Sequence, residues 1–353
     1  MLTYIHIPFC DSKCYYCSFN SYTNLHDRIA KYMQALKRQL LWDLERFNVE
    51  PNSLETLFIG GGTPSCVEVK YYEEVFKILK PYLRKNAEIT TEANPNSATQ
   101  EWLEGMQALG VNRVSFGVQS FSNKKLQELN RAHNANEAIK AVKNAHNLGI
   151  KNISLDIIYD FYSDSKELIS NDLKQAFTLP INHISAYELT IEKATNFSKT
   201  PEVKKGSESL GYHLKELVTK QGFSQYEVSN YGTYQSLHNI GYWKHKEYLG
   251  IGAGAVGYKN QERYYPNTNI DNYIKEPTKI RTEKLTSQDI ITEKIFLGLR
   301  SCVGVGQDIL TKEQVKQANI LLKEDKLSFK DGRYFNKEYF LSDEYALFIT
   351  WVW

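Results

Sequence analysis

Short apolar runs alternate with amphipathic stretches through the first two thirds of the chain. Residues 4–7 form an apolar run, and within 27–47 the apolar residues Ile29, Met33 and Leu36 recur at helical spacing. The same pair of patterns then repeats, with strand-like runs at 56–59, 88–93, 113–118, 154–159 and 183–189 and helix-like stretches at 70–82, 99–109, 123–129 with 134–148, 166–177 and 207–221. Six βα units in series predict a parallel sheet. Right-handed crossovers curl such a sheet into a barrel, which six units leave incompletely closed.

The alternation stops after residue 222. The pattern predicts a strand at 223–228, and the stretches 236–243 and 248–258 are rich in aromatic residues and glycine. A helical pattern covers 286–299, and the tail follows with a helix at 312–324, strands at 327–330 and 334–335, and a helix at 342–350. This order is typical of a winged-helix-like module. We therefore expect an α/β core at 1–222, an extension at 223–284 that packs on the barrel, and a small α+β domain at 285–353.

Composition and charge narrow the class of protein. Apolar residues make up 42% and charged residues 24% of the 353 positions, as in ordinary soluble globular proteins. The formal net charge is +2, and no dense lysine or arginine tract indicates a nucleic-acid partner. The N-terminus has no secretory-signal pattern, and no apolar run is long enough to cross a membrane. With an odd number of cysteines as well, we expect a cytoplasmic protein in a reducing compartment.

Three cysteines, Cys10, Cys14 and Cys17, lie close together on the loop expected after the first strand. Thiolates so close in sequence converge on one centre only where the loop wraps around it. A tetrahedral zinc ion needs four ligands, the fourth of which His6 or His26 would have to supply. A [4Fe–4S] cluster can be held by three cysteines, which leaves one iron free for another ligand. A disulfide with one free thiol is a further alternative, and the spacing favours the cluster.

A glycine run, Gly60-Gly61-Gly62-Thr63-Pro64, follows the second apolar strand. Glycines there let backbone atoms approach a ligand closely and adopt φ values that other residues avoid. The run is not a P-loop, because no Gly-Lys-Ser/Thr follows, and it does not match G-x-G-x-x-G. Alone it predicts a tight turn, whereas its place one strand after the cysteine loop favours a cofactor-binding turn.

Taken together, these motifs resemble those of the HemN/HemW branch of the radical S-adenosylmethionine (SAM) family. The matching segments span essentially the whole chain and include Tyr-Ile-His-Ile-Pro-Phe-Cys at 4–10, the glycine run, Thr-Glu-Ala-Asn-Pro at 91–95, Val-Ser-Phe-Gly-Val-Gln-Ser-Phe at 114–121, Leu-Asn-Arg-Ala-His at 129–133 and Leu-Asp-Ile-Ile-Tyr at 155–159. The resemblance implies an incomplete (β/α)6 radical SAM barrel, with a [4Fe–4S] cluster on the three cysteines and SAM chelating the free iron.

The resemblance also assigns roles to single positions. Those implied to line the SAM site are Tyr4, Tyr16, Gly61, Gly62, Thr63, Glu92, Gln119, Arg131 and Asp156. Among them, Glu92 would accept from the ribose hydroxyls, and Arg131 suits a carboxylate. Judged singly, Glu92, Arg131 and Asp156 fit a structural ion-pair network in a barrel mouth equally well.

Departures from the HemN pattern separate the two sides of the branch. HemN decarboxylases carry another cysteine two positions after the third ligand, and this chain has Phe19 at that position. They also carry a long N-terminal extension ahead of the cluster, whereas only nine residues precede Cys10 in this chain. Both features favour the HemW side, whose members resemble haem-handling chaperones. A further departure belongs to neither side: Tyr159-Asp160-Phe161-Tyr162 stands where the family usually has a Gly-Leu-Pro turn.

A second motif, His238-Asn239-Ile240-Gly241-Tyr242-Trp243, matches the H-N-x-x-Y-W pattern of HemW proteins. Imidazole is a common haem-iron ligand, and adjacent aromatic rings can pack on a porphyrin face. His238 is therefore the candidate haem ligand, with His245 and Cys302 as weaker candidates. Without the resemblance, one histidine beside aromatic residues is more often a packed or hydrogen-bonded side chain.

Two functions remain open. The first is a haem chaperone that carries the cluster and SAM and passes haem to an acceptor protein. The second is an enzyme that uses a deoxyadenosyl radical on coproporphyrinogen or on another substrate. Barrel and cofactor residues fit both, because a fold does not fix a substrate. An electron donor for the cluster and a homodimer are compatible with either function.

Overall fold

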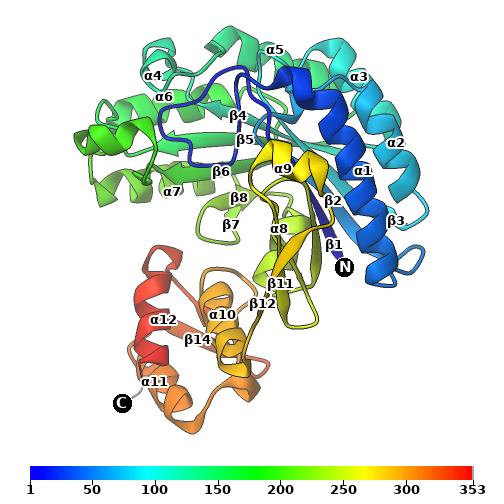
Figure 1. The fold of residues 1–353 in the computed structure, drawn as a ribbon. Helices are drawn as coiled ribbons and strands as arrows, with labels where there is room; N and C mark the ends of the chain where they lie inside the picture. The colour runs from blue at the N-terminus through cyan, green and yellow to red at the C-terminus, as the bar shows by residue number, and fades with distance from the viewer. Residues whose placement is uncertain (352–353) are drawn as a thin grey trace.

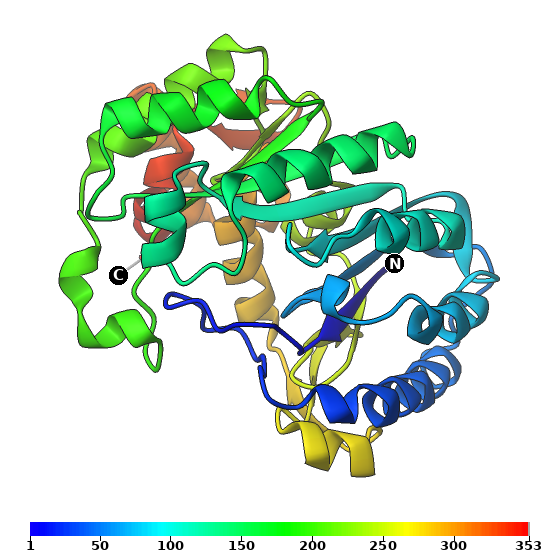
Figure 2. The same cartoon turned by 90° about the horizontal axis from the view of Figure 1, so that it is seen from above.

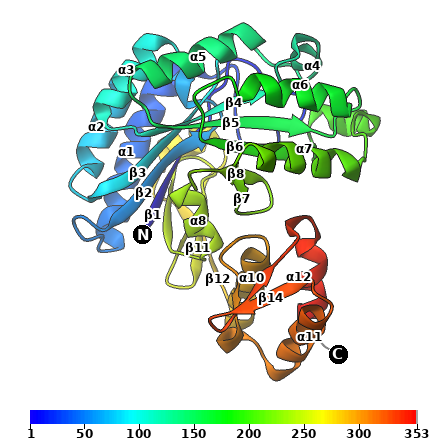
Figure 3. The ribbon, with the colours of Figure 1, turned by 180° about the vertical axis from the view of Figure 1, so that it is seen from behind.

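The computed structural model describes residues 1–351 of the chain. Its larger part is a curved α/β array with helices outside the sheet, and a smaller α+β lobe lies beside it (Figures 1 and 3). Within residues 1–351, no helix is long and apolar enough to cross a membrane.

Six βα units build the larger part, as the alternating pattern predicts. The strands are β1 (Leu2–Ile7), β2 (Leu54–Gly61), β3 (Leu83–Ala93), β4 (Arg113–Gln119), β5 (Asn152–Tyr159) and β6 (His183–Glu188). The helices are α1 (Ile29–Arg46), α2 (Lys70–Leu79), α3 (Gln100–Leu109), α4 (Asn123–Glu128), α5 (Ala135–Asn147), α6 (Lys166–Ala176) and α7 (Glu208–Lys220). Each lies within a few residues of its predicted range.

These strands are parallel neighbours in one 12-stranded sheet of order β12-β11-β10-β9-β1-β2-β3-β4-β5-β6-β8-β7. The outermost strands, β12 and β7, do not pair with each other, so the barrel stays open, as expected of six units. Seen from above, the strands and their helices form an arc, and the dark blue loop after β1 lies within it (Figure 2).

The segment that follows α7 extends both ends of this sheet. On the β6 side it supplies β7 (Ser224–Gln225) and β8 (Asn230–Gly232), and it continues through α8 (Leu237–Trp243). On the β1 side it supplies β9 (Tyr248–Ile251), β10 (Gly257–Lys259) and β11 (Glu262–Pro266), then α9 (Ile270–Lys275) and β12 (Ile280–Lys284). The predicted strand at 223–228 is shorter than expected, because Val228 N donates to the Arg300 carbonyl instead of the sheet.

Alternation along the strands separates the two faces of the sheet. Leu57 and Ile59 of β2 are buried in the core beneath α1 and α2, whereas the residues between them face the inside of the barrel. On that inner face the neighbouring strands carry polar side chains, among them Glu92, Ser115 and Asp156. The outer face therefore stabilises the barrel, and the inner face is left for chemistry.

The smaller lobe is built from α10 (Ser287–Leu299), β13 (Val305–Gly306), α11 (Lys312–Lys323), β14 (Leu327–Lys330), β15 (Arg333–Asn336) and α12 (Ser342–Thr350). Its three strands form a separate antiparallel sheet with its own apolar core, which confirms the winged-helix-like tail. The short strand β13 carries too few residues to show a pattern in the sequence. Hydrogen bonds from Cys302 N to the Tyr226 carbonyl and from Lys215 Nζ to Glu338 join the lobe to the barrel.

Candidate cluster and cofactor site

The three cysteines occupy the irregular loop after β1, at the carboxyl end of the barrel. Backbone hydrogen bonds hold this loop, from Cys10 N to the Tyr22 carbonyl (3.0 Å) and from Cys17 N to the Cys14 carbonyl (3.1 Å). All three thiols line one cavity of about 340 Å³, together with the ends of β2, β3, β4 and β5. The loop therefore presents its thiols to the inside of the barrel mouth, where parallel βα folds place their working groups.

The donor set fits an iron–sulfur cluster better than the alternatives. All five cysteines are free, so the disulfide alternative is not found. His6, a candidate fourth ligand for zinc, has both ring nitrogens in hydrogen bonds, with Tyr4 Oη at 2.9 Å and with the Asn20 carbonyl at 2.8 Å. Burial raises the pKa of the Cys10 and Cys17 thiols, so their deprotonated forms need a bound cation or hydrogen-bond donors.

The glycine run brings the end of β2 against the cysteine loop. A Cβ on Gly62 would lie 2.8 Å from the Phe9 carbonyl oxygen and 3.0 Å from Cys10 Sγ. Gly61 has φ +114°, and a Cβ there would lie 2.4 Å from the His6 ring. Next to them, Thr63 Oγ1 donates to Cys10 Sγ at 3.4 Å. Only glycine permits this approach, and the run thereby forms the wall of the cavity beside the first thiol.

Glu92, near the end of β3, is a carboxyl group with an unusual environment. Its Oε2 accepts from Gly61 N at 3.0 Å. Burial, with the neighbouring Asp156 carboxylate, raises the pKa of Glu92 to about 7. Burial also raises the pKa of Asp156, which accepts from Ser115 Oγ at 3.0 Å. Two partly buried carboxyl groups, of which Asp156 raises the pKa of Glu92, favour a ligand that brings hydroxyl donors or positive charge.

Arg131 lies between the cysteine loop and the strand ends. Its Nη1 is 3.2 Å from both Cys14 Sγ and Tyr16 Oη, and its Nη2 donates to Asn94 Oδ1 (2.7 Å) and to the Gly117 carbonyl (2.6 Å). Its Nη1 and Nη2 are aimed at a thiol, a hydroxyl and the barrel wall, so Arg131 supplies positive charge beside the cysteine loop. Among the described residues its Nε has no hydrogen-bond partner, and a contact between Arg131 and a ligand carboxylate stays a prediction.

Most of the predicted site residues meet in the one cavity. Those that line it are Cys10, Cys14, Cys17, Tyr16, Gly61, Gly62, Thr63, Glu92, Gln119, Arg131 and Asp156. Tyr4 is not among them: its hydroxyl is hydrogen-bonded to His6 Nδ1 at 2.9 Å, and its ring lies 6.2 Å from that of Phe58. Burial and then the Glu92 carboxylate raise the pKa of Tyr4, so Tyr4 lies near the cavity wall, and its expected contact with SAM stays a prediction.

His238 also lies apart from the cavity. It is 1% exposed on α8, shares a 2.6 Å hydrogen bond between Nδ1 and Thr56 Oγ1, and lies between the rings of Phe58 and Tyr242. The Glu88 carboxylate accepts from the backbone N–H groups of Leu237 and His238 and so caps α8. The packed, hydrogen-bonded histidine is thus the arrangement that the structure contains. As it stands, the ring is closed to haem iron.

Several residues that line the cavity were not singled out from the sequence, and three of them bear on its chemistry. Asn94 bridges Arg131 and Thr63 through hydrogen bonds of its side chain. The sequence could have indicated it, because it belongs to the Thr-Glu-Ala-Asn-Pro motif. Tyr187, on β6, is 43% exposed although it lies on the inner face of the barrel. Lys13 lies between two of the cysteines and donates to the Phe19 carbonyl and to Ser21. Nothing in the local pattern distinguishes the last two from surface residues.

Comparison with known proteins now gives the class. Residues 4–175 match the model of the radical SAM superfamily, and this segment contains the cysteine loop and every strand end that lines the cavity except that of β6. The whole chain superposes on the coproporphyrinogen III oxidase HemN of Escherichia coli with a TM-score of 0.82, covering 99% of this chain and 90% of that one at 19% identity. The fold and the three-cysteine cavity define a radical SAM protein.

Curated relatives narrow the class to one family. The chain is 34% identical over 317 residues to the haem chaperone HemW of Lactococcus lactis, which covers 86% of this chain and 82% of the relative. It is 39% identical over 265 residues to the haem chaperone HemW of Escherichia coli, covering 72% and 69%. The chain belongs to the HemW family.

Proposed function

We propose that this protein is a haem chaperone that carries a [4Fe–4S] cluster and SAM and delivers haem to an acceptor protein. The observation that carries the proposal is the single cavity shared by three free thiols, a partly buried arginine and two partly buried carboxyls. The relatives named as haem chaperones at 34% and 39% identity support the haem part of it.

Different residues of the cavity would hold the cluster and SAM. Cys10, Cys14 and Cys17 would hold the cluster, which when bound supplies an iron without a protein ligand and an electron for SAM. Arg131 places positive charge at the Cys14 sulfur, and Thr63 places a hydroxyl at that of Cys10. Both favour anionic sulfur over thiol.

The carboxyl side of the cavity suits the nucleoside of SAM. Glu92 keeps Oε1 free of a protein hydrogen bond while Gly61 N fixes Oε2, so one oxygen can accept from a ribose hydroxyl. Asp156 and Gln119 complete this wall, and Gln119 adopts φ +66° at the end of β4. The negative charge of this wall also complements the sulfonium of SAM.

We rank the three candidate haem ligands by how exposed each side chain is. His238 is enclosed, and His245 Nε2 contacts Glu293 at 2.8 Å, whereas Cys302 is an exposed free thiol. Haem iron therefore reaches His238 only if α8 moves, and Cys302 without such a movement. We propose Cys302 as the first residue to test, with His238 as the alternative.

Anaerobic reconstitution with iron and sulfide, followed by haem titration, tests the proposal. We expect a Soret shift on haem addition, with no conversion of coproporphyrinogen III. In the same sample, deoxyadenosine formation that depends on coproporphyrinogen would favour the radical enzyme instead. Titration of Cys302→Ser and His238→Asn then shows which side chain, if either, ligates the iron.

A further inference from the structure

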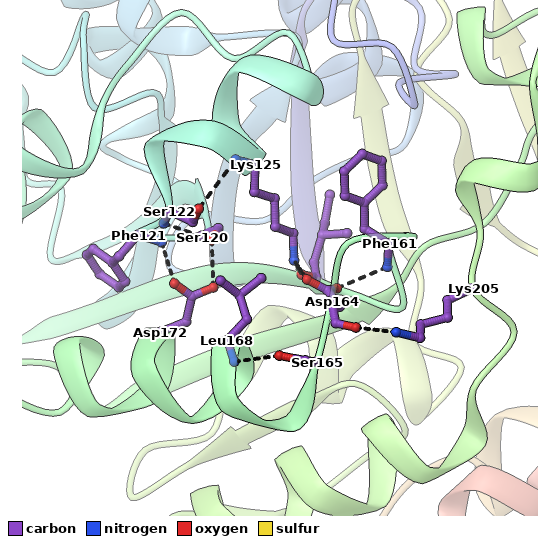
Figure 4. Close-up of polar contacts among 11 residues, drawn as sticks. Ser120, Phe121, Ser122, Lys125, Phe161, Asp164, Ser165, Leu168, Asp172 and Lys205 are labelled. Atoms are coloured by element: carbon purple, nitrogen blue, oxygen red, sulfur yellow. Dashed lines mark hydrogen bonds and ion pairs between the residues drawn. The ribbon is translucent and has the colours of Figure 1, made fainter.

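A buried ion pair joins the loops that follow β4 and β5 (Figure 4). Lys125, on α4, is 2% exposed, and its Nζ donates to Asp164 Oδ1 at 2.6 Å and to the Ile158 carbonyl at 2.7 Å. Asp164 lies fully buried in the loop between β5 and α6, where its other oxygen accepts from Phe161 N at 3.0 Å. The lysine of one βα unit thus makes two hydrogen bonds to the next unit, one to strand β5 and one to the loop that follows it.

A second carboxylate makes the reverse connection. Asp172, on α6, accepts from Ser120 Oγ at 2.6 Å and from Phe121 N at 2.7 Å. Ser120 directly follows Gln119, which lines the cofactor cavity. Each of the two loops is therefore fixed by a charged side chain from the neighbouring unit, and neither can shift without the other (Figure 4).

From Lys125, one route of contacts leads to the cysteine loop. The three residues after α4 all contact that loop: the Leu129 carbonyl accepts from Tyr15 N (3.2 Å), Asn130 Nδ2 donates to the Lys13 carbonyl (2.8 Å), and Arg131 Nη1 contacts Cys14 Sγ (3.2 Å). Because Lys125 holds α4 against β5 and its loop, it fixes the position of the three residues that contact the cysteine loop.

From Asp164, a second route reaches the same loop from the other side. Its carboxylate fixes Phe161 N, and the Phe161 ring stacks on Phe197 with centroids 5.8 Å apart. Phe197 N donates to the Tyr15 carbonyl at 3.0 Å, and the two rings meet edge to face at 5.8 Å. Both routes end on Tyr15, between the second and third cysteines.

We propose that Lys125 and Asp164 form a positioning pair that fixes the cysteine loop before any cluster is bound. The loop at 11–24 has no helix and only a single bridge partner at Tyr22, so its shape must be held from outside. The ion pair closes a ring through Leu129, Tyr15, Phe197 and Phe161. A buried ion pair contributes little net stability compared with apolar residues in its place. The role of this pair is therefore to fix the positions of the two loops through its directional hydrogen bonds.

The test separates positioning from stability with a double variant, Lys125→Met/Asp164→Leu. Single changes would leave one buried charge unpaired and lower stability strongly, whereas the double change removes both charges. Lys215→Met/Glu338→Leu serves as the matched control, since that pair joins the barrel to the smaller lobe and does not contact the cysteine loop. Thermal unfolding of both metal-free variants shows whether each retains the fold.

Amide hydrogen exchange of the metal-free full chain is the first measurement. In the double variant we expect the peptide covering 10–20, which contains Tyr15 N, to exchange about tenfold faster than in the wild type. In the control variant we expect wild-type exchange there. If the double variant folds and exchanges like the wild type, the positioning pair is refuted. If it does not fold, Phe197→Leu cuts the second route without touching a charge, and unchanged exchange in that variant refutes the proposal equally.

The second measurement rests on the proposed function and uses reconstituted protein. SAM should change the electron paramagnetic resonance spectrum of the reduced wild-type cluster, and at equal SAM the double variant should show a smaller change. A wild type that shows no SAM-dependent change contradicts the proposed cofactor site, while the exchange result on metal-free protein still decides the positioning pair. A normal SAM response in the double variant overturns the inference and leaves the proposed function intact.

Discussion

The guanidinium of Arg131 lies against the thiol of Cys14, with Nη1 3.2 Å from Sγ, while Nη2 is fixed by the Gly117 carbonyl at 2.6 Å. A Cβ on Gly117 would lie 3.1 Å from Nη2, so a larger residue there would press on the guanidinium. The arginine therefore cannot swing toward solvent without losing its wall contacts. A cation fixed in this way stabilises a thiolate whether or not a cluster is present.

Arg131→Met should weaken retention of the cluster. One hydrogen bond to a charged group contributes about 1.5–3 kcal/mol, so we expect chelator to remove iron about tenfold faster or more. Loss of cluster absorbance after chelator addition measures this rate. Arg28→Met is the control, since Arg28 pairs with surface carboxylates far from the site. Equal rates in Arg131→Met and wild type would contradict the role assigned to this residue.

Cys10→Ala, Cys14→Ala and Cys17→Ala should each abolish the visible absorption of the reconstituted cluster, because a cubane held by two thiolates has no protein ligand for two of its irons. Cys66→Ala should keep it. Burial raises the pKa of the Cys66 thiol, and it lies beside Asp11, which disfavours a thiolate further. An absorbing cluster in Cys14→Ala would disprove the ligand assignment.

SAM affinity should depend on pH through Glu92. Its pKa is raised to about 7, so the carboxylate that accepts from ribose hydroxyls is partly protonated at neutral pH. Affinity should therefore rise from pH 6 to pH 8, by up to about tenfold, since the protonated fraction falls over that range. In Glu92→Gln the affinity should be lower at pH 8 and nearly flat with pH. Calorimetric titration at three pH values checks this, and a wild-type slope retained in Glu92→Gln would exclude Glu92 as its source.

The parallel barrel and the position of the cavity could be predicted because both depend on local pattern. Apolar runs and amphipathic stretches define the βα units, and loops after parallel strands meet at one end of the sheet. Cys10 follows such a strand, Glu92 lies near the end of one and Asp156 lies within one, so their convergence could be expected without knowledge of packing. The same rule does not place the side chain of Tyr4, whose hydroxyl is hydrogen-bonded to His6.

The positions that could not be predicted depend on long-range packing. The segment 236–243 is a helix capped by Glu88, which lies about 150 positions earlier in the chain. No local pattern indicates that pairing, so the sequence does not show which residues enclose His238. Likewise, nothing in the local sequence singles out Lys125 and Asp164, because only the contact between two βα units buries them.

In the purified chain, the main effect of His238 should be on the free energy of unfolding and on how that free energy depends on pH. Burial lowers its pKa to about 3, whereas an unfolded histidine titrates near 6.5. Between these values the unfolded chain binds a proton that the folded chain does not, so the free energy of unfolding falls as pH falls, by about 1.4 kcal/mol per pH unit for this residue. His238→Asn keeps a polar atom near Thr56 and cannot titrate, so its free energy of unfolding should fall less steeply between pH 6 and pH 4.

His133, whose pKa is also lowered to about 3 and whose Nε2 bonds the Val118 carbonyl, should retain its own share of the slope in that variant. Urea unfolding at several pH values measures both slopes. Identical slopes in wild type and His238→Asn would mean that the ring is solvated in solution, and the exposed imidazole would then return as a haem-iron ligand.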